Sequence, residues 1–189
     1  MTKIGIITGS TREGRVNLDV ANWVLDIAKN SGIEADFELV DIKDYDLPLI
    51  NTAPPGALNK QYPNENTQKW SEKIDSLDGF IFVTPEYNKT ISPALANAID
   101  VISPEWSNKA AGIVGYGSTS GVTATQSLRI ILSNFHIATT SAFGALSLFT
   151  DFENMSVFKP AEHNVPTVTA VVAQTAAWAT AFKNYKNSL

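Results

Sequence analysis

The sequence predicts an α/β fold in which a doubly wound, five-stranded parallel sheet carries helices on both faces. Short apolar runs alternate along the chain with segments whose apolar residues recur at helical spacing, as in strand–helix–strand units. Some runs are apolar throughout, which is typical of strands buried on both faces of a parallel sheet. No fixed-period repeat and no linker interrupts the alternation, so we expect one domain over residues 1–189.

Each expected element has a local signal in the sequence. Val20, Val24 and Ile27 recur at helical spacing in the first helix, and Ser92-Pro93 is typical of a helix N-cap followed by a first helical residue. We expect strands over 4–8, 35–41, 79–84, 109–116 and 136–142. We expect helices over 17–30, 67–77, 94–102, 121–135 and 167–187. Residues 45–66 are predicted to form a long surface loop, and the stretch before residue 166 is expected to be irregular.

Composition excludes several classes of protein. The chain carries 44% hydrophobic and 17% charged residues, and its net charge of −5 argues against nucleic-acid binding. The absence of cysteine excludes disulfides, thiol nucleophiles and cysteine-ligated metals. We find no signal peptide and no apolar run near the ~20 residues that span a membrane. We therefore expect a cytoplasmic protein without a membrane partner.

The stretch after the first expected strand has the composition of an anion-binding loop. Residues 9–15 read Gly-Ser-Thr-Arg-Glu-Gly-Arg and precede the first helix. Backbone N–H groups, the positive end of the helix dipole and the hydroxyls of Ser10 and Thr11 supply donors. Arg12 and Arg15 add guanidinium groups, whose planar fork matches phosphate oxygens. We expect this loop to hold a phosphate.

Two further loops follow the third and fourth strands, which lie side by side next to the first strand in a 2-1-3-4-5 order. Pro85, Glu86, Tyr87 and Asn88 follow the third strand, and residues 116–121 follow the fourth. Ligands of such sheets bind at the carboxyl ends of the strands, so the three loops are expected to converge on one crevice. Each loop also has a plainer interpretation: Tyr87 packs on the sheet edge, Asn88 caps the next helix, and Glu86 is a surface or interface charge.

Competing signatures fit the chain poorly. The dinucleotide pattern Gly-x-Gly-x-x-Gly is broken because Thr11 stands where its second glycine belongs, and the Gly-Lys-Ser/Thr loop is missing. Residues 117–121 place a serine one position late for a hydrolase elbow, and His136 is a poor partner for it. We assign no catalytic side chain and no metal ligand.

Gly-Ser-Thr-Arg-x-x-Arg after the first strand, combined with Pro-Glu-Tyr-Asn after the third, resembles the NADPH-dependent FMN reductase family. These flavodoxin-like proteins include quinone, chromate and azo-compound reductases. The similarity covers roughly residues 1–140 and continues through Asn97-Ala98-Ile99-Asp100, Glu105-Trp106 and Lys109. It implies a flavodoxin-like fold and a homodimer or homotetramer.

The resemblance implies a flavin site built from the three loops. The first loop would hold the FMN phosphate, and the second would line the isoalloxazine and ribityl region, mostly through backbone groups. The third would approach the dimethylbenzene or the pyrimidine side. The implied residues, loop by loop, are Gly9, Ser10, Thr11, Arg12, Arg15 and Asn17; Pro85, Glu86, Tyr87 and Asn88; Gly117 and Ser118.

The third loop departs from the family pattern. The family often carries Gly-Gly-x-x-Gly-Gly there, where this chain reads Gly-Ser-Thr-Ser-Gly-Val over 117–122. Side chains at Ser118 and Val122 narrow the room for close backbone approach, which is expected to alter flavin affinity or nicotinamide docking.

The activity that the resemblance implies is FMN-dependent NAD(P)H oxidation. Hydride would pass from NADPH or NADH through the flavin to a small-molecule electron acceptor such as a quinone. Three alternatives stay open: a reductase that treats FMN as a dissociable substrate, a flavodoxin-type one-electron carrier, and a flavin- or nucleotide-binding module with a regulatory role. Arg12, Arg15 and the modest net charge speak against a carrier, because such proteins usually have an arginine-free phosphate loop and a strongly acidic face.

Overall fold

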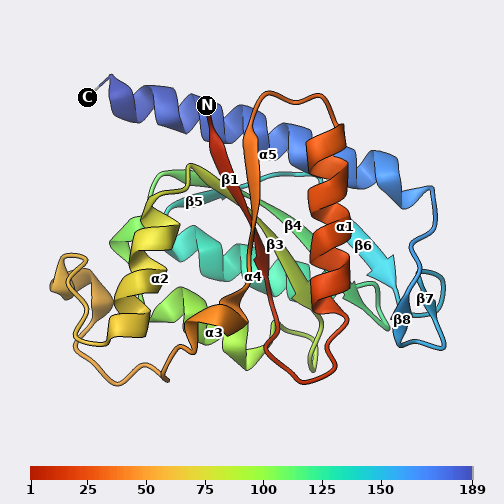
Figure 1. Ribbon diagram of the computed structural model, residues 1–189, viewed down its shortest axis with the longest axis horizontal. Helices are drawn as coiled ribbons and strands as arrows, with labels where there is room; N and C mark the ends of the chain where they lie inside the picture. Colours follow the sequence, from red (N-terminus) through yellow and green to blue (C-terminus); the bar gives the residue numbers. More distant parts are fainter. Residues whose placement is uncertain (189) are drawn as a thin grey trace.

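A six-stranded sheet forms the centre of the computed structural model, which describes residues 1–188 (Figure 1). Five strands run parallel in the order β2-β1-β3-β4-β5, and β6 is parallel to β4. This order confirms the predicted 2-1-3-4-5 arrangement. The strands are β1 (Lys3–Thr8), β2 (Asp36–Val40), β3 (Gly79–Pro85), β4 (Lys109–Gly117), β5 (Ile137–Thr139) and β6 (Gly144–Ser147).

The strand expected over 136–142 is shorter in the structure, where it is β5, and a further strand, β6, lies in the stretch that was expected to be irregular. Both β5 and β6 pair with β4, but the chain leaves the ladder between them. The Thr140 hydroxyl donates to the carbonyl of Ala142 at 3.0 Å, a local bond that competes with strand pairing. The expected irregular stretch also contains a small hairpin of β7 (Phe152–Glu153) and β8 (Val157–Phe158). In its turn, Asn154 and Met155 have positive φ. Methionine rarely adopts this backbone conformation.

Helices cover both faces of the sheet, and two separate apolar cores result. One face is covered by α1 (Asn17–Asn30) and α5 (Asn164–Asn187). The other is covered by α2 (Glu65–Asp75), α3 (Pro93–Asp100) and α4 (Val122–Asn134). Short 3-10 turns, η1 (Ile42–Tyr45), η2 (Pro55–Leu58) and η3 (Pro104–Trp106), lie in the connections.

Successive strand residues point to opposite faces of the sheet. The side chains of a fully apolar strand therefore pack alternately into the two cores. In β3, Phe80 and Phe82 join the core beneath α2, where Trp106 packs against both rings. Ile81 and Val83 join the core beneath α1 and α5. All four of these β3 side chains are fully buried, so the strand is held rigidly and its end positions the second loop.

Helix α5 departs from the expectation that no apolar segment is long enough to cross a membrane. By length and composition it meets that criterion, with a mean hydropathy of 1.2 in its most apolar window. Its buried residues recur on one face, however, and pack against β3 and β4: Val168, Val171, Val172, Thr175, Ala176 and Ala179. In this structure α5 is a covering helix of the sheet (Figure 1).

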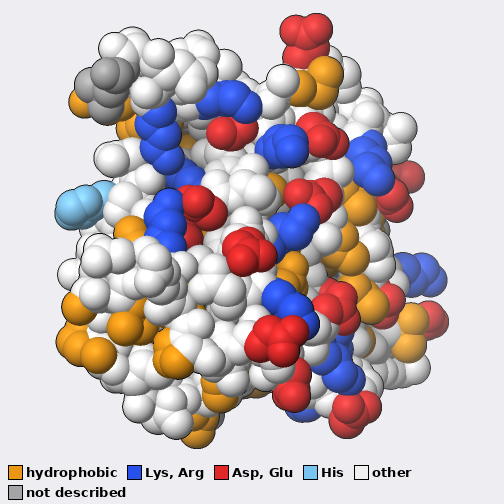
Figure 2. Space-filling view, turned by 60° about the vertical axis from the view of Figure 1, so that its left-hand side comes forward, with side chains coloured by type: hydrophobic (Ala, Val, Ile, Leu, Met, Phe, Trp, Pro, Cys, Tyr) orange, Lys and Arg blue, Asp and Glu red, His pale blue; other side chains and the backbone are white. Residues whose placement is uncertain are grey.

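Acidic and basic side chains are interspersed over the surface that Figure 2 shows. Some of the charges are paired, as in Lys73–Glu38 at 2.9 Å and Lys60–Asp75 at 2.6 Å. Such exposed pairs contribute little to stability, typically below about 1 kcal/mol.

Candidate functional site

The three loops expected at the site lie together at the carboxyl ends of β1, β3 and β4. The hydroxyls of Ser10 and Tyr87 are 3.1 Å apart, which links the first loop to the second. The Glu86 amide donates to the Tyr116 carbonyl at 2.8 Å, which links the second loop to the third. The convergence follows from the strand order, because β3 lies between β1 and β4.

The base of the first loop is held by Asn17 and Gly9. The Gly9 amide donates to Asn17 Oδ1 at 2.8 Å, and Asn17 Nδ2 donates to the Val83 carbonyl at 2.9 Å. A Cβ on Gly9 would lie 2.6 Å from the same carbonyl oxygen, so only glycine fits here. The side chain of Asn17 is fully buried with both polar groups paired, and it ties the loop to β3.

The two arginines of the loop have different surroundings, and Arg15 is the buried one. Its guanidinium forms a two-pronged ion pair with Asp41, one prong at 2.8 Å, and also donates to the Ser10 carbonyl. The two side chains are only 9% and 10% exposed. Burial opposes ionisation of Asp41, but hydrogen bonds from Arg15, the Lys43 amide and Thr8 outweigh it and hold the Asp41 pKa below its usual value. Arg15 thus fastens the loop to the end of β2.

Arg12, in contrast, is exposed and forms no hydrogen bond or ion pair through its side chain with residues 1–188. It borders a groove of about 230 Å³ together with Ser10, Thr11 and Tyr87. The remaining lining residues are Ser92, Pro93 and Ala94. Hydroxyls and an unpaired guanidinium around a glycine-based loop form a donor set that fits a phosphate group.

The second loop ends in a tight hairpin. Tyr87 and Thr90 exchange backbone hydrogen bonds of 2.9 and 3.0 Å, and the two residues between them have positive φ, 49° at Asn88 and 69° at Lys89. This is the geometry of a two-residue turn, for which asparagine is well suited. Asn88 therefore does not cap α3. Ser92 does, by accepting from the Leu95 amide at 3.0 Å, which confirms the predicted N-cap.

Glu86 is a helix cap and not a free surface charge. Its side chain is 5% exposed and accepts hydrogen bonds from the Thr119 hydroxyl and from the Thr123 and Ala124 amides at 3.2 and 3.3 Å. Those amides belong to the first turn of α4, whose N-cap, Gly121, has no side chain to offer. Burial raises the pKa of Glu86, but these hydrogen bonds outweigh it and the net pKa is lowered.

The third loop packs tightly against the second. A Cβ on Gly117 would lie 2.9 Å from Glu86 Cβ, so glycine permits this contact. Ser118 is exposed, and Val122, the first residue of α4, is 40% exposed. The two side chains that replace family glycines therefore lie at the surface of the loop.

Sequence reasoning missed two residues that position the site. Asp41 orders the first loop through Arg15 and accepts from the Thr8 hydroxyl at 2.8 Å. Ser92 donates to the Gly9 carbonyl at 2.6 Å in addition to capping α3. A signal for Asp41 exists in the sequence, since an acidic residue directly after the strand beside β1 lies within reach of that loop.

Comparison with known proteins agrees with this geometry. Residues 2–151 match the NADPH-dependent FMN reductase family. The chain belongs to that family. It is 37% identical over 132 residues to an NAD(P)H-dependent FMN reductase of a Nectria species, a match that covers 68% of this chain and 66% of the relative. It is 29% identical over 187 residues to a quinone reductase of Pseudomonas putida, with 93% of each covered.

The fold is shared with a solved flavoenzyme. FerB of Paracoccus denitrificans, an NAD(P)H:(acceptor) oxidoreductase, superposes with a TM-score of 0.73 at 20% identity and covers 96% of this chain and 99% of its own. These findings confirm the resemblance read from the sequence motifs and the flavodoxin-like fold. Membership of this family gives FMN and NAD(P)H as the cofactor and co-substrate.

Proposed function

We propose that this chain is an FMN-dependent oxidoreductase that takes hydride from NADPH or NADH and reduces a small-molecule acceptor such as a quinone. The observation that carries the proposal is the unpaired Arg12 beside Ser10 and Thr11, at the groove where β1 ends. Family membership supports the identity of the ligand, and the name of the Pseudomonas putida relative supports a quinone as acceptor.

In this proposal, different residues of the site bind different parts of FMN. Ser10, Thr11 and Arg12 hold its phosphate, while Arg15 and Asn17 keep the loop in shape. Gly9 and Gly117 allow the close packing at the base of the site. The remaining residues of the site line the ribityl and ring region: Pro85, Glu86, Tyr87, Asn88 and Ser118. FMN supplies hydride transfer when bound, so the protein contributes binding and orientation.

The proposal does not require a proton-donating side chain. Glu86 is the one carboxylate in the second loop, and its lowered pKa keeps it ionised at neutral pH. A group that is ionised and hydrogen-bonded to a helix end is a structural acceptor, not a general acid.

We also propose the wider setting of the enzyme. Residues 1–189 act as one flavodoxin-like FMN-binding domain, the protein is cytoplasmic, and it assembles as a homodimer or homotetramer. Neither nucleic acid nor a membrane is a partner. The net charge of −5 speaks against a nucleic-acid partner, and the burial of one face of α5 against the sheet speaks against a membrane partner. The oligomeric state is proposed from the family resemblance.

An anaerobic absorbance titration tests the function. FMN-loaded protein is expected to lose its flavin absorbance when NADPH is added and to recover it when a quinone follows. Flavin that is bound but not reduced by NADPH or NADH would contradict the proposal and favour an electron carrier. Gel filtration of the loaded protein adds a second readout, because flavin that separates from the protein identifies FMN as a dissociable substrate.

The phosphate assignment is tested with Arg12→Ala. Loss of a charged hydrogen bond to phosphate is expected to weaken FMN binding by about 1.5–3 kcal/mol, which is roughly 10- to 150-fold in Kd. Fluorescence titration of the apoprotein with FMN measures it. Lys29→Ala, which removes an exposed cation at the far end of α1, is the matched control and is expected to bind FMN normally. Equal Kd values for the two variants would remove Arg12 from the site.

A further inference from the structure

Lys89 is held at the point where the second and third loops meet. It lies at the tip of the two-residue hairpin between Tyr87 and Thr90, where the hairpin geometry gives it a φ of 69°. Its amine is 3.3 Å from the Thr119 hydroxyl of the third loop and 3.5 Å from Glu86 Oε1 of the second loop. The fold therefore places a cation at the junction of two loops of the site.

The hairpin that carries Lys89 is anchored to its surroundings. The Thr90 hydroxyl lies 2.7 Å from the Ser127 hydroxyl of α4, and Ser92, two residues further along the chain, donates to the Gly9 carbonyl of the first loop at 2.6 Å. These contacts fix the backbone of the turn beside the site. The Lys89 side chain is 63% exposed, so its amine can still move toward a ligand in the crevice.

The carboxylate beside Lys89 is stabilised mainly by other groups. Glu86 accepts hydrogen bonds from the Thr119 hydroxyl and from the Thr123 and Ala124 amides of α4. Its side chain is 5% exposed, and its 3.5 Å contact with the Lys89 amine is at the limit of a hydrogen bond. The wall of the site thus contains a buried, ionised carboxylate with a mobile cation next to it.

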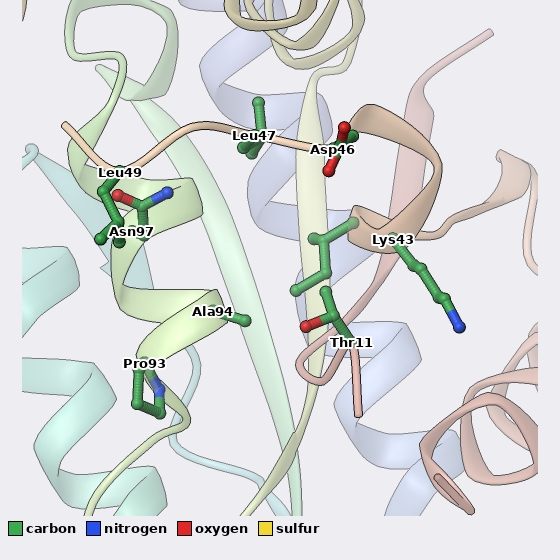
Figure 3. Close-up of a pocket in the computed structure, with 9 residues that line it drawn as sticks. Thr11, Lys43, Asp46, Leu47, Leu49, Pro93, Ala94 and Asn97 are labelled. Carbon is green, nitrogen blue, oxygen red and sulfur yellow. The ribbon is translucent and has the colours of Figure 1, made fainter. Parts of the chain in front are cut away.

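The other cations near the three loops have different partners. Arg15 is paired with Asp41, and Arg12 is assigned to the FMN phosphate. The Lys43 amine is paired with Glu13 at 2.9 Å, and its side chain extends away from α3 (Figure 3). It borders a hollow of about 480 Å³ whose lining includes no residue of the second or third loop. Within those two loops, the hairpin lysine is the one cation.

We propose that Lys89 offsets the negative charge that FMN gains on reduction and thereby raises its reduction potential. This inference rests on the proposed function, because it takes the second and third loops to line the ring of FMN. Hydride transfer brings one negative charge to that ring, and the ionised Glu86 in the same wall disfavours this charge. A cation between the two loops has the opposite effect. Lys89 therefore tunes the cofactor electrostatically and donates no proton to it.

A series of charges at position 89 tests the proposal. The dissociation constants of oxidised FMN and of dithionite-reduced FMN are measured anaerobically, by tryptophan fluorescence, for the wild type, Lys89→Arg, Lys89→Met and Lys89→Glu. The ratio of the oxidised to the reduced constant is expected to stay the same in Lys89→Arg. It is expected to fall about threefold in Lys89→Met and about tenfold in Lys89→Glu, because an exposed cation acts partly through water. A tenfold change corresponds to ~30 mV in the midpoint potential of a two-electron couple.

Lys69→Met is the matched control. Lys69 is 59% exposed and pairs with Glu65, much as Lys89 contacts Glu86, but it lies on α2, outside the three loops. Its ratio of constants is expected to equal that of the wild type. Salt separates an effect of charge from an effect of structure, because raising the ionic strength from about 0.01 M to about 1 M shortens the screening length from ~30 to ~3 Å. The difference between Lys89→Met and the wild type is expected to shrink accordingly.

The outcomes distinguish this inference from the proposed function. The tuning role is overturned by equal ratios in Lys89→Met and Lys69→Met, by an equal fall in Lys89→Arg and Lys89→Met, or by a difference that high salt does not reduce. The measurements use dithionite and need no NAD(P)H. Bound FMN that follows the charge series but is not reduced by NADPH or NADH contradicts the proposed function alone. Bound FMN that is reduced by NADPH but does not respond to the series contradicts only the role of Lys89.

Discussion

Arg12 and Arg15 show how one residue type takes two roles within four positions. Arg15 is buried and its guanidinium is paired with Asp41 and the Ser10 carbonyl, so its charge is already neutralised within the protein. Arg12 has no such partner among residues 1–188 and remains available to a ligand. The structure therefore separates an arginine that shapes the loop from one that is free to bind an anion.

Breaking the Arg15–Asp41 pair tests the shaping role. Asp41→Asn is expected to lower the free energy of unfolding by about 2–3 kcal/mol, because it removes charged hydrogen bonds from a mostly buried guanidinium. It is also expected to weaken FMN binding, since the Ser10 carbonyl loses its anchored partner. Urea unfolding and FMN titration measure the two effects. Asp44→Asn, at an exposed position of η1, is the control, and identical results for both variants would remove Asp41 from this role.

Local composition predicted the residues of the site but not how each one is used. The glycines, hydroxyls and arginines of the first loop are visible in the sequence, and so is the Ser92 cap. Arg12 and Arg15 take different roles because Arg15 pairs with Asp41. The pairing of β1 with β2 brings Asp41 close to the first loop, and no local sequence pattern shows this pairing. For the same reason, no local pattern reveals that Glu86 caps a helix that begins 36 residues later.

At the scale of elements, the long periodic segments were predicted well and the short ones were not. The first helix matches α1 over 17–30, and the strand over 79–84 lacks only the last residue of β3. Strand β6 and the hairpin of β7 with β8 were missed, and β5 is shorter than the strand predicted over 136–142. Two- to four-residue strands carry too little periodicity to detect, and their positions depend on long-range pairing with β4 or on turn geometry.

The contact between Glu86 and α4 joins the second loop to a helix. Glu86→Gln is expected to reduce the free energy of unfolding by about 1 kcal/mol, because a neutral amide interacts less with the positive end of the helix. Urea unfolding of the apoprotein measures it. Glu34→Gln, at an exposed position before β2, is the reference substitution. A change no larger than that of the reference would mean that the cap adds nothing to stability.

Lys109 joins two elements in a comparable way, and its stabilising role depends on pH. It stands at the start of β4, and its amine donates to the carbonyls of Ile74 and Asp75 at the end of α2, at 2.6 and 3.2 Å. Burial lowers the pKa of Lys109 from 10.5 to about 7. Between these values the unfolded chain binds more protons at this position than the folded one does.

The sign of the resulting pH dependence follows from that difference. The free energy of unfolding is expected to rise between pH 7 and 10, by at most about 1.4 kcal/mol per pH unit from this group. Lys109→Met removes this contribution, so its stability is expected to rise less steeply than that of the wild type. Unfolding curves at pH 7, 8 and 9 measure the slopes, with Lys29→Met, at the exposed last turn of α1, as the control. Parallel slopes in all three proteins would refute the buried titration.

At the scale of the whole molecule, the order of the strands determines which loops meet at the site. Placing β3 between β1 and β4 brings together loops that are more than 70 residues apart in the chain. The sheet can do this only if both of its faces are covered. Length and composition alone would class α5 as a possible membrane-spanning helix. In the structure, one of its faces is buried on β3 and β4, so it is a covering helix of the sheet.

Close packing of α5 on the sheet depends on a glycine in the middle of β4. A Cβ on Gly112 would lie 2.6 Å from Val171 Cγ1 and would also meet Thr175, so Gly112→Ala must shift these side chains or the helix that carries them. We expect this variant to lower the free energy of unfolding by about 1–3 kcal/mol, the usual cost of overpacking a core. Gly56→Ala adds the same atom where the nearest neighbour is 3.8 Å away and is expected to be nearly neutral. Urea unfolding compares the two, and equal stabilities would mean that α5 rests on the sheet too loosely to be a core helix.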